Sequence, residues 1–122
     1  MHDFKYRDNE FYCEKVAIKK LVERFGTPLY VYSHKTLIDH YTKLKRAFAS
    51  IHPLICFSVK SNSNLSILKA LVTSGAGLDI GSGGELYRAQ KIGAQAKKIV
   101  FASVGKTKAE IEAAISAGIL FF

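Results

Sequence analysis

A lysine that directly follows a short apolar segment is the residue of this chain best suited to chemistry. Lys60 comes immediately after residues 55–59, which read ICFSV. Partial burial beside such a segment disfavours the ammonium form and promotes a neutral, nucleophilic amine. An amine of this kind forms a Schiff base with a carbonyl cofactor. The alternative is a lysine whose stem packs along a sheet while its head reaches water, and position alone favours that alternative.

Two acidic residues follow in the next part of the chain. Asp79 stands at the end of a second short apolar segment, so it is expected at the same edge as Lys60, where it would assist proton movement or hold a cationic group. The alternative for Asp79 is a turn residue that takes a local backbone hydrogen bond. Glu85 stands three residues after Ser82, and this capping-box spacing already explains it.

Other motifs for phosphates or metals are incomplete. Residues 75–80 (GAGLDI) lack the last glycine of a dinucleotide fingerprint, and Val100 stands where a P-loop before Lys106 requires glycine. The four histidines have no ligand spacing, and Cys13 and Cys56 are far apart without C-x-x-C spacing. We therefore expect no metal site and two reduced thiols.

Composition excludes several classes of function. The 122 residues are 48% hydrophobic and carry a formal net charge of +8, but the basic residues are scattered and no aromatic-basic run occurs, so nucleic-acid binding is not expected. No apolar stretch approaches the roughly 18 residues of a membrane-spanning helix. The first residues have no secretory apolar core, so a cytoplasmic location is expected.

A regular alternation of strands and helices is expected from residue 55 onward. Short apolar segments begin at residues 55, 77, 99 and 119, and each of the first three is followed by a helical pattern. Asn64 is expected to cap the first of these helices, Ser82 with Glu85 the second, and Thr107 with Glu110 the third. Such alternation predicts a parallel sheet with right-handed crossovers.

The region before residue 55 has a different pattern. A helix is expected over residues 16–25, ending at Gly26, and a strand over residues 29–32. Ser33 is placed to cap a long helix over residues 35–48. A weaker strand pattern lies around residues 11–13.

Two architectures share the strand–helix pattern, the open doubly wound sheet and the closed eight-stranded barrel. Very short strands at regular intervals, without a dinucleotide fingerprint, favour the barrel. A closed barrel needs about 250 residues. The chain ends inside an apolar segment, Leu120 to Phe122, so we expect the first part of a longer barrel.

Four blocks of the sequence resemble one family. Residues 57–65 (FSVKSNSNL) resemble the cofactor-lysine motif Y-A-V-K-A-N-x-N of diaminopimelate decarboxylases. Residues 78–89 (LDIGSGGELYRA) are similar to the family block D-V-x-S-G-G-E-L, and residues 98–107 (KIVFASVGKT) to I-V-F-x-G-x-G-K-T. Residues 26–32 (GTPLYVY) match an early strand of the family. Ser58 and Ser61 replace the commoner alanines of the family, and Ser103 stands where glycine is usual.

The resemblance implies an α/β fold, namely part of a (β/α)8 TIM barrel of the alanine-racemase-like type. Residues 1–33 would contribute to a separate β domain, and residues 34–122 would begin the cofactor-binding barrel. Lys60 would be the catalytic residue, holding pyridoxal 5'-phosphate as a Schiff base, and Asp79 would also contact the cofactor. The implied reaction is decarboxylation of meso-2,6-diaminopimelate to L-lysine by a homodimer, with the fragment alone inactive.

Two alternatives remain open within the resemblance. The first is a sister decarboxylase acting on ornithine, arginine or carboxynorspermidine, since these enzymes share the lysine motif. The second is a non-catalytic barrel protein that carries pyridoxal phosphate. The residues that separate them are expected beyond Phe122.

Overall fold

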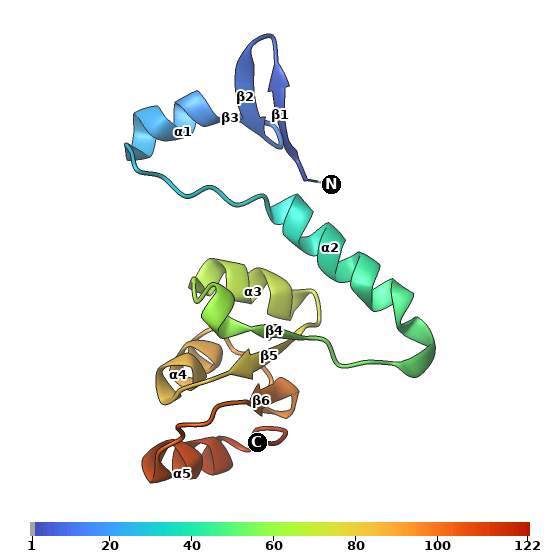
Figure 1. The fold of residues 1–122 in the computed structure, drawn as a ribbon, viewed down its shortest axis with the longest axis vertical. Helices are drawn as coiled ribbons and strands as arrows, with labels where there is room; N and C mark the ends of the chain where they lie inside the picture. The colour runs from blue at the N-terminus through green and yellow to red at the C-terminus, as the bar shows by residue number, and fades with distance from the viewer. Residues whose placement is uncertain (1) are drawn as a thin grey trace. The chain divides into compact units, whose positions relative to one another are not determined.

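The computed structural model describes residues 2–122 and divides the chain into two compact units. The first unit runs to Thr42 and the second comprises Lys43–Phe122. Figure 1 traces the elements of both units in chain order. Across residues 2–122, none of the helices is both long and apolar enough to cross a membrane.

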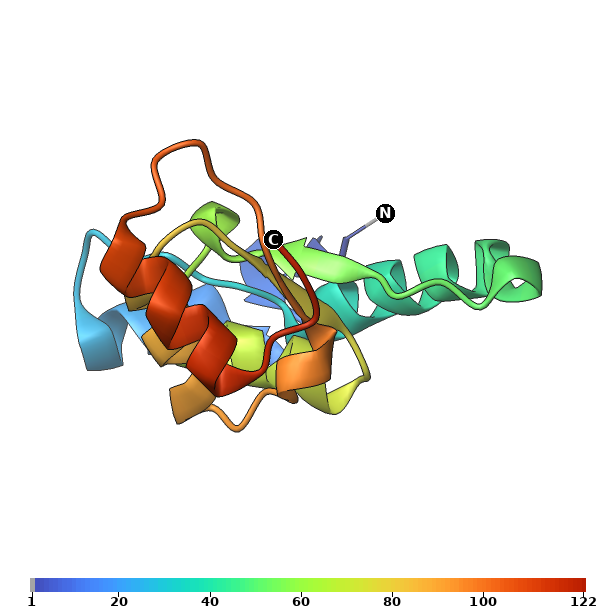
Figure 2. The ribbon, with the colours of Figure 1, turned by 90° about the horizontal axis from the view of Figure 1, so that it is seen from below.

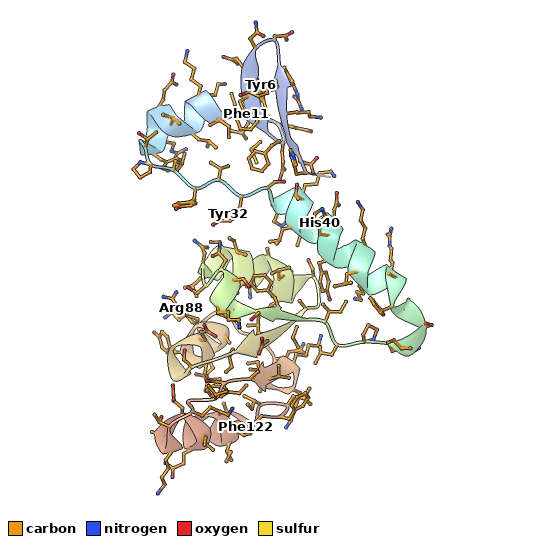
Figure 3. All side chains as sticks on the ribbon, viewed as in Figure 1. Tyr6, Phe11, Tyr32, His40, Arg88 and Phe122 are labelled. Atoms are coloured by element: carbon orange, nitrogen blue, oxygen red, sulfur yellow. The ribbon has the colours of Figure 1, made fainter. Side chains whose placement is uncertain are left out.

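The first unit contains a small antiparallel sheet. Strands β1 (Phe4–Arg7) and β2 (Glu10–Cys13) form a hairpin, and β3 (Val16–Ala17) pairs with the end of β2. The two turn residues between β1 and β2 both have positive φ, which is the backbone that a tight two-residue hairpin requires. Tyr6 and Phe11 lie opposite each other in the hairpin, and their rings stack with centroids 4.9 Å apart (Figure 3).

The structure corrects two expectations in this unit. The helix predicted over residues 16–25 begins later, as α1 (Ile18–Phe25), because Val16 and Ala17 pair with β2 instead. It ends at Gly26, as predicted, with a φ of 77°. The strand predicted over residues 29–32 is wrong, since these residues have no regular secondary structure. Alternation of apolar side chains does not make a strand unless a partner strand supplies the ladder.

Helix α2 (His34–Ala47) begins at a cap supplied by two parts of the chain. The Ser33 hydroxyl accepts a hydrogen bond from the Thr36 amide at 3.0 Å, as the sequence predicted. One Glu14 carboxylate oxygen accepts hydrogen bonds from the Ser33 hydroxyl and the Lys35 amide, both at 2.8 Å. A residue of the hairpin region therefore satisfies the orphan donors at the start of α2.

The second unit is built on a parallel sheet. Strands β4 (Cys56–Ser58), β5 (Gly77–Ile80) and β6 (Ile99–Phe101) lie in that order, and both pairings are parallel. A parallel bridge between Val100 and Phe121 continues the sheet beyond β6. Helices α3 (Leu65–Thr73), α4 (Gly83–Lys91) and α5 (Lys108–Ala117) connect the strands. Short 3₁₀ turns lie at Ala49–Ile51, Val59–Ser61 and Ala96–Lys98. The predicted parallel alternation is confirmed.

The three helices of this unit cover one face of the sheet. Because successive strands are neighbours and the crossovers are right-handed, each helix packs on the same side, as Figures 1 and 2 show. Strand residues that point to this side form the core together with helix residues. The largest fully buried side chains are those of Phe101, Leu68, Leu78, Ile80, Ile99 and Val59.

The other face of the sheet carries a row of half-buried residues. Ser58, Asp79 and Val100 are aligned by the parallel register of β4, β5 and β6. Since side chains alternate along a strand, this row points away from Leu78 and Ile80. The sheet therefore separates an apolar core from a face that bears a carboxylate.

Candidate functional site

Lys60 lies just beyond the carboxyl end of β4. The strand ends at Ser58, and Val59–Ser61 form a 3₁₀ turn in which Val59 is fully buried. Val59 anchors the turn in the core, while Lys60 is exposed. The expectation of a partly desolvated lysine is therefore not met among residues 2–122. The 3₁₀ turn carries Lys60 past the edge of the sheet, so the strand does not cover its stem.

The loop that follows Lys60 is fixed by its own polar side chains. Asn62 accepts a hydrogen bond from the Asn64 amide at 3.0 Å, and Asn64 caps α3 by accepting one from the Ser66 amide at 2.9 Å. Arg88 of α4 donates to the Ser63 carbonyl oxygen at 3.2 Å, and Figure 3 labels this side chain between α4 and α3. The backbone that follows Lys60 is thus held by hydrogen bonds at Asn62, Ser63 and Asn64.

A hollow collects residues from three strand ends. Its volume is about 650 Å³ and it is open to solvent. It is lined by Lys60, Gly81, Ser82, Glu85, Ala102, Ser103 and Val104. The three polar loops that the sequence pointed to therefore meet at one edge of the sheet, as parallel strands require.

Asp79 stands slightly away from this hollow. It is the third residue of β5 and not its last, and it does not line the hollow. Asp79 is half-buried, and its Oδ1 is buried with no hydrogen-bond partner within residues 2–122. A buried carboxylate oxygen without a donor is costly, so its presence indicates that a donor or cation belongs beside it.

Glu85 makes only part of the predicted capping box. The Ser82 hydroxyl accepts a hydrogen bond from the Glu85 amide at 3.3 Å, as expected. The Glu85 carboxylate instead reaches one residue further back and accepts a hydrogen bond from the Gly81 amide at 2.7 Å. Glu85 therefore holds the loop that lines the hollow as well as facing the hollow itself.

The third loop closes on itself next to the hollow. Lys106 donates to the Ser103 carbonyl oxygen at 2.7 Å, and its ammonium lies 5.3 Å from the centroid of the Phe101 ring. The Ser103 hydroxyl accepts a hydrogen bond from the Gly105 amide at 3.3 Å. Beyond this loop, Thr107 and Glu110 form the complete capping box that the sequence predicted.

Two groups in this region, Cys56 and Glu110, have shifted pKa values. Burial, and secondarily the Asp79 carboxylate, raise the pKa of the half-buried Cys56 thiol. Hydrogen bonds from the Thr107 amide, the Gly83 amide and the Thr107 hydroxyl lower the pKa of Glu110. In the part of the chain that the structure describes, no three His, Cys, Asp or Glu side chains gather as a metal site would require.

Sequence reasoning missed two contacts near the site, one made by Glu110 and one by Arg88. Besides its own cap, Glu110 accepts a hydrogen bond from the Gly83 amide at 2.7 Å, which joins α5 to the start of α4. The sequence contained the capping box of Glu110 but no pattern that pairs residues 27 positions apart. Arg88 was also missed, because an exposed arginine on a helix has no signature of its own.

Known proteins are similar to this chain in both sequence and fold. Diaminopimelate decarboxylase of Neisseria meningitidis serogroup B is 49% identical over 111 residues, which are 91% of this chain and 27% of that protein. The crystal structure of AQ1208 from Aquifex aeolicus superposes with a TM-score of 0.92 and 45% identity, over 98% of this chain and 29% of that one. The chain thus spans less than a third of the length of the relatives that it matches.

A third protein extends the likeness in fold. Diaminopimelate decarboxylase from M. jannaschii, solved in co-complex with L-lysine, matches with a TM-score of 0.92 and 36% identity, over 97% of this chain and 29% of that one. The α/β unit described above is accordingly part of a (β/α)8 barrel of the alanine-racemase-like type. Residues 34–122 also match the family described as pyridoxal-dependent decarboxylase, pyridoxal binding domain. With its lysine at a strand end and its match over most of its length, the chain belongs to the pyridoxal-dependent decarboxylases.

Proposed function

We propose that the protein containing this chain decarboxylates meso-2,6-diaminopimelate to L-lysine, with pyridoxal 5'-phosphate held by Lys60. The observation that carries the proposal is the position of this primary amine. Lys60 stands just after the end of β4 and lines a hollow. Residues that follow β5 and β6 line the same hollow. The choice of substrate is supported by the 49% identity to a diaminopimelate decarboxylase.

The residues present fit a pyridoxal phosphate cofactor. Lys60 supplies the amine that a carbonyl cofactor needs, and it is exposed to the hollow without a strand covering it. The buried Oδ1 of Asp79 lacks a donor among residues 2–122, so it has a free acceptor position for a polar group. When bound, the cofactor supplies an electron sink for the electrons that remain after carbon dioxide leaves.

The chain's own residues have three tasks in this proposal. Lys60 would attach the cofactor through its Nζ. Once Lys60 is released from the cofactor, its Nζ would be the group that carries a proton. Asp79 presents a carboxyl group on the face of β5 that points away from the core, where it stabilises a positive or protonated group. Glu85 holds Gly81 in place at the hollow through its hydrogen bond to the Gly81 amide.

The arrangement of the whole protein is part of the same proposal. We assign residues 1–33 to a β domain and residues 34–122 to the start of the cofactor-binding barrel. A homodimer, which the family resemblance implies, and a cytoplasmic location complete the proposal.

The test is to supply the purified full-length protein, loaded with pyridoxal phosphate, with candidate substrates one at a time. Release of carbon dioxide and L-lysine from meso-2,6-diaminopimelate is the expected result. L-ornithine, L-arginine and carboxynorspermidine are tested in the same way, because they are the substrates of the sister enzymes. Preference for any of them would replace the proposed substrate, and cofactor binding without carbon dioxide release would identify a non-catalytic carrier.

A further inference from the structure

One carboxylate joins the starts of two helices beside the hollow. Glu110 Oε1 accepts a hydrogen bond from the Gly83 amide of α4 at 2.7 Å. Glu110 Oε2 accepts hydrogen bonds from the Thr107 amide and the Thr107 hydroxyl of its own helix start, both at 2.9 Å. The two oxygens of a single side chain are thereby divided between α4 and α5.

Gly83 supports this reading independently. A Cβ placed on Gly83 would lie 3.1 Å from Cγ of Glu110, which is tighter than most Cβ contacts, and 3.4 Å from its Oε1. Gly83 does not have a positive φ, so its backbone conformation does not demand glycine. The absence of a side chain at this position instead leaves Glu110 room to reach the amide without being displaced.

The two helix starts belong to the loops that line the hollow. Gly81 and Ser82 directly precede Gly83, while Ser103 and Val104 lie just before Thr107. Glu85 holds the first loop from within its own helix. The Glu110 contact with Gly83 is of another kind, because it runs from the first turn of α5 to the first residue of α4.

We propose that Glu110 is a positioning residue, which fixes the spacing of the Gly81–Ser82 loop and the Ser103–Val104 loop around Lys60. The inference rests on the proposed function, since it deepens the role of the same hollow. Glu110 does not line the hollow and so acts through Gly83. Its three donors also hold the pKa of its carboxyl below the usual range, so the carboxylate stays ionised at neutral pH.

The experiment compares Glu110→Gln with Gly83→Ala in the full-length protein. An amide oxygen cannot serve both helix starts, and a methyl group on Gly83 displaces Glu110 from the other side. Each variant should lower kcat about 10- to 100-fold, the range that follows a small displacement of catalytic groups, with little change in KM. Glu112→Gln is the matched control, because Glu112 lies on the same helix and its carboxylate forms an exposed ion pair with Lys108 at 3.8 Å.

Two readouts do not depend on turnover. The dissociation constant of pyridoxal phosphate should rise several-fold in both variants, and hydrogen exchange of the residue 81–83 amides should accelerate in the cofactor-free protein. In the double variant the effects should be no larger than in one single variant, because both remove the same contact. Far-UV circular dichroism checks that each variant is folded, and Gly83→Ala carries the test if Glu110→Gln does not fold.

Two results would overturn the proposal. The first is a lowered Tm in Glu110→Gln with kcat, cofactor affinity and amide exchange all as in the unmodified protein, which would make Glu110 a stabilising cap only. The second is full additivity of the two substitutions. If the unmodified protein releases no lysine from diaminopimelate, the proposed function fails, but cofactor affinity and amide exchange still decide the role of Glu110.

Discussion

Ser58 of β4, two residues before Lys60, lies directly opposite Asp79 of β5 in the parallel register. Val100 of β6 extends the same row. Because residues in one row of a sheet point to the same side, the Ser58 hydroxyl and the Asp79 carboxylate share the face that leads to the hollow. The buried oxygen of Asp79 is thus held by a strand, one residue before the strand ends.

Asp79→Asn should weaken pyridoxal phosphate binding at least about tenfold, the loss expected for one hydrogen bond to a charged group. The cofactor-free protein should keep its Tm nearly unchanged, because Oδ1 has no donor to lose within residues 2–122. Thermal unfolding with and without the cofactor measures both quantities, since a ligand that binds the native state raises Tm. An equal fall of Tm in both conditions would show that Asp79 has a purely structural role.

Lys60→Ala in the full-length protein should abolish both the visible absorbance of the bound cofactor and the release of carbon dioxide. The reason is that no other group at the end of β4 supplies an amine to the hollow. Lys97→Ala, which alters an exposed lysine in another 3₁₀ turn, should leave both unchanged. Borohydride reduction followed by peptide mapping gives the decisive check, and cofactor fixed on a lysine other than Lys60 would refute the assignment.

Glu14→Gln should lower Tm at neutral pH and have no effect in acid. The Lys35 amide and the Ser33 hydroxyl lower the pKa of Glu14, with a smaller contribution from His34, while burial and Asp3 oppose them. A carboxyl with a lowered folded-state pKa stabilises above its unfolded value of about 4.3, and this contribution is lost as the pH falls through the folded pKa. The Tm difference between the two proteins should therefore shrink below about pH 4.

The matched control for this prediction is Glu23→Gln, since Glu23 is an exposed carboxylate on α1 of the same unit. It should leave the dependence of Tm on pH unaltered. A Tm difference for Glu14→Gln that persists unchanged into acid would mean that its charge does not stabilise the start of α2.

A polypeptide of residues 1–122 alone should self-associate and bind pyridoxal phosphate weakly. Leu120, Phe121 and Phe122 are each at least 40% exposed, and Val104 is fully exposed, so apolar side chains meet water around the last part of the sheet. Such surfaces favour contacts between chains. Analytical ultracentrifugation with denaturant unfolding tests this expectation, and a monomer that unfolds cooperatively and forms lysine would contradict it.

Features that depend on neighbouring residues were predictable from the sequence. The spacing of apolar residues predicted β5 at Gly77–Ile80 as observed, and the caps by Asn64 and Thr107 followed from residue types at fixed offsets. Glycine at position 118 ended α5 in the left-handed conformation, with a φ of 68°. These elements are determined by local preferences, which a pattern of a few residues contains.

Features that depend on strand pairing, on an irregular turn or on residues distant in the chain were not predictable. The segment 29–32 has the composition of a strand but no ladder partner among residues 2–122, and Val16 joined β3 because Cys13 offered one. The exposure of Lys60 follows from a 3₁₀ turn that the apolar pattern of β4 did not indicate. Glu14 and Glu110 each cap a helix to which they do not belong, and only the folded chain brings them there.

The order β4-β5-β6 also bears on how this unit is made. Strands β5 and β6 each pair with the strand that precedes them in the chain, so these two pairings do not wait for a residue synthesised much later. Contacts of low sequence separation form quickly, and chains fold from the N-terminus as they leave the ribosome. The sheet is therefore suited to grow one strand and one helix at a time during translation, with Lys60 placed before the rest of the hollow is assembled around it.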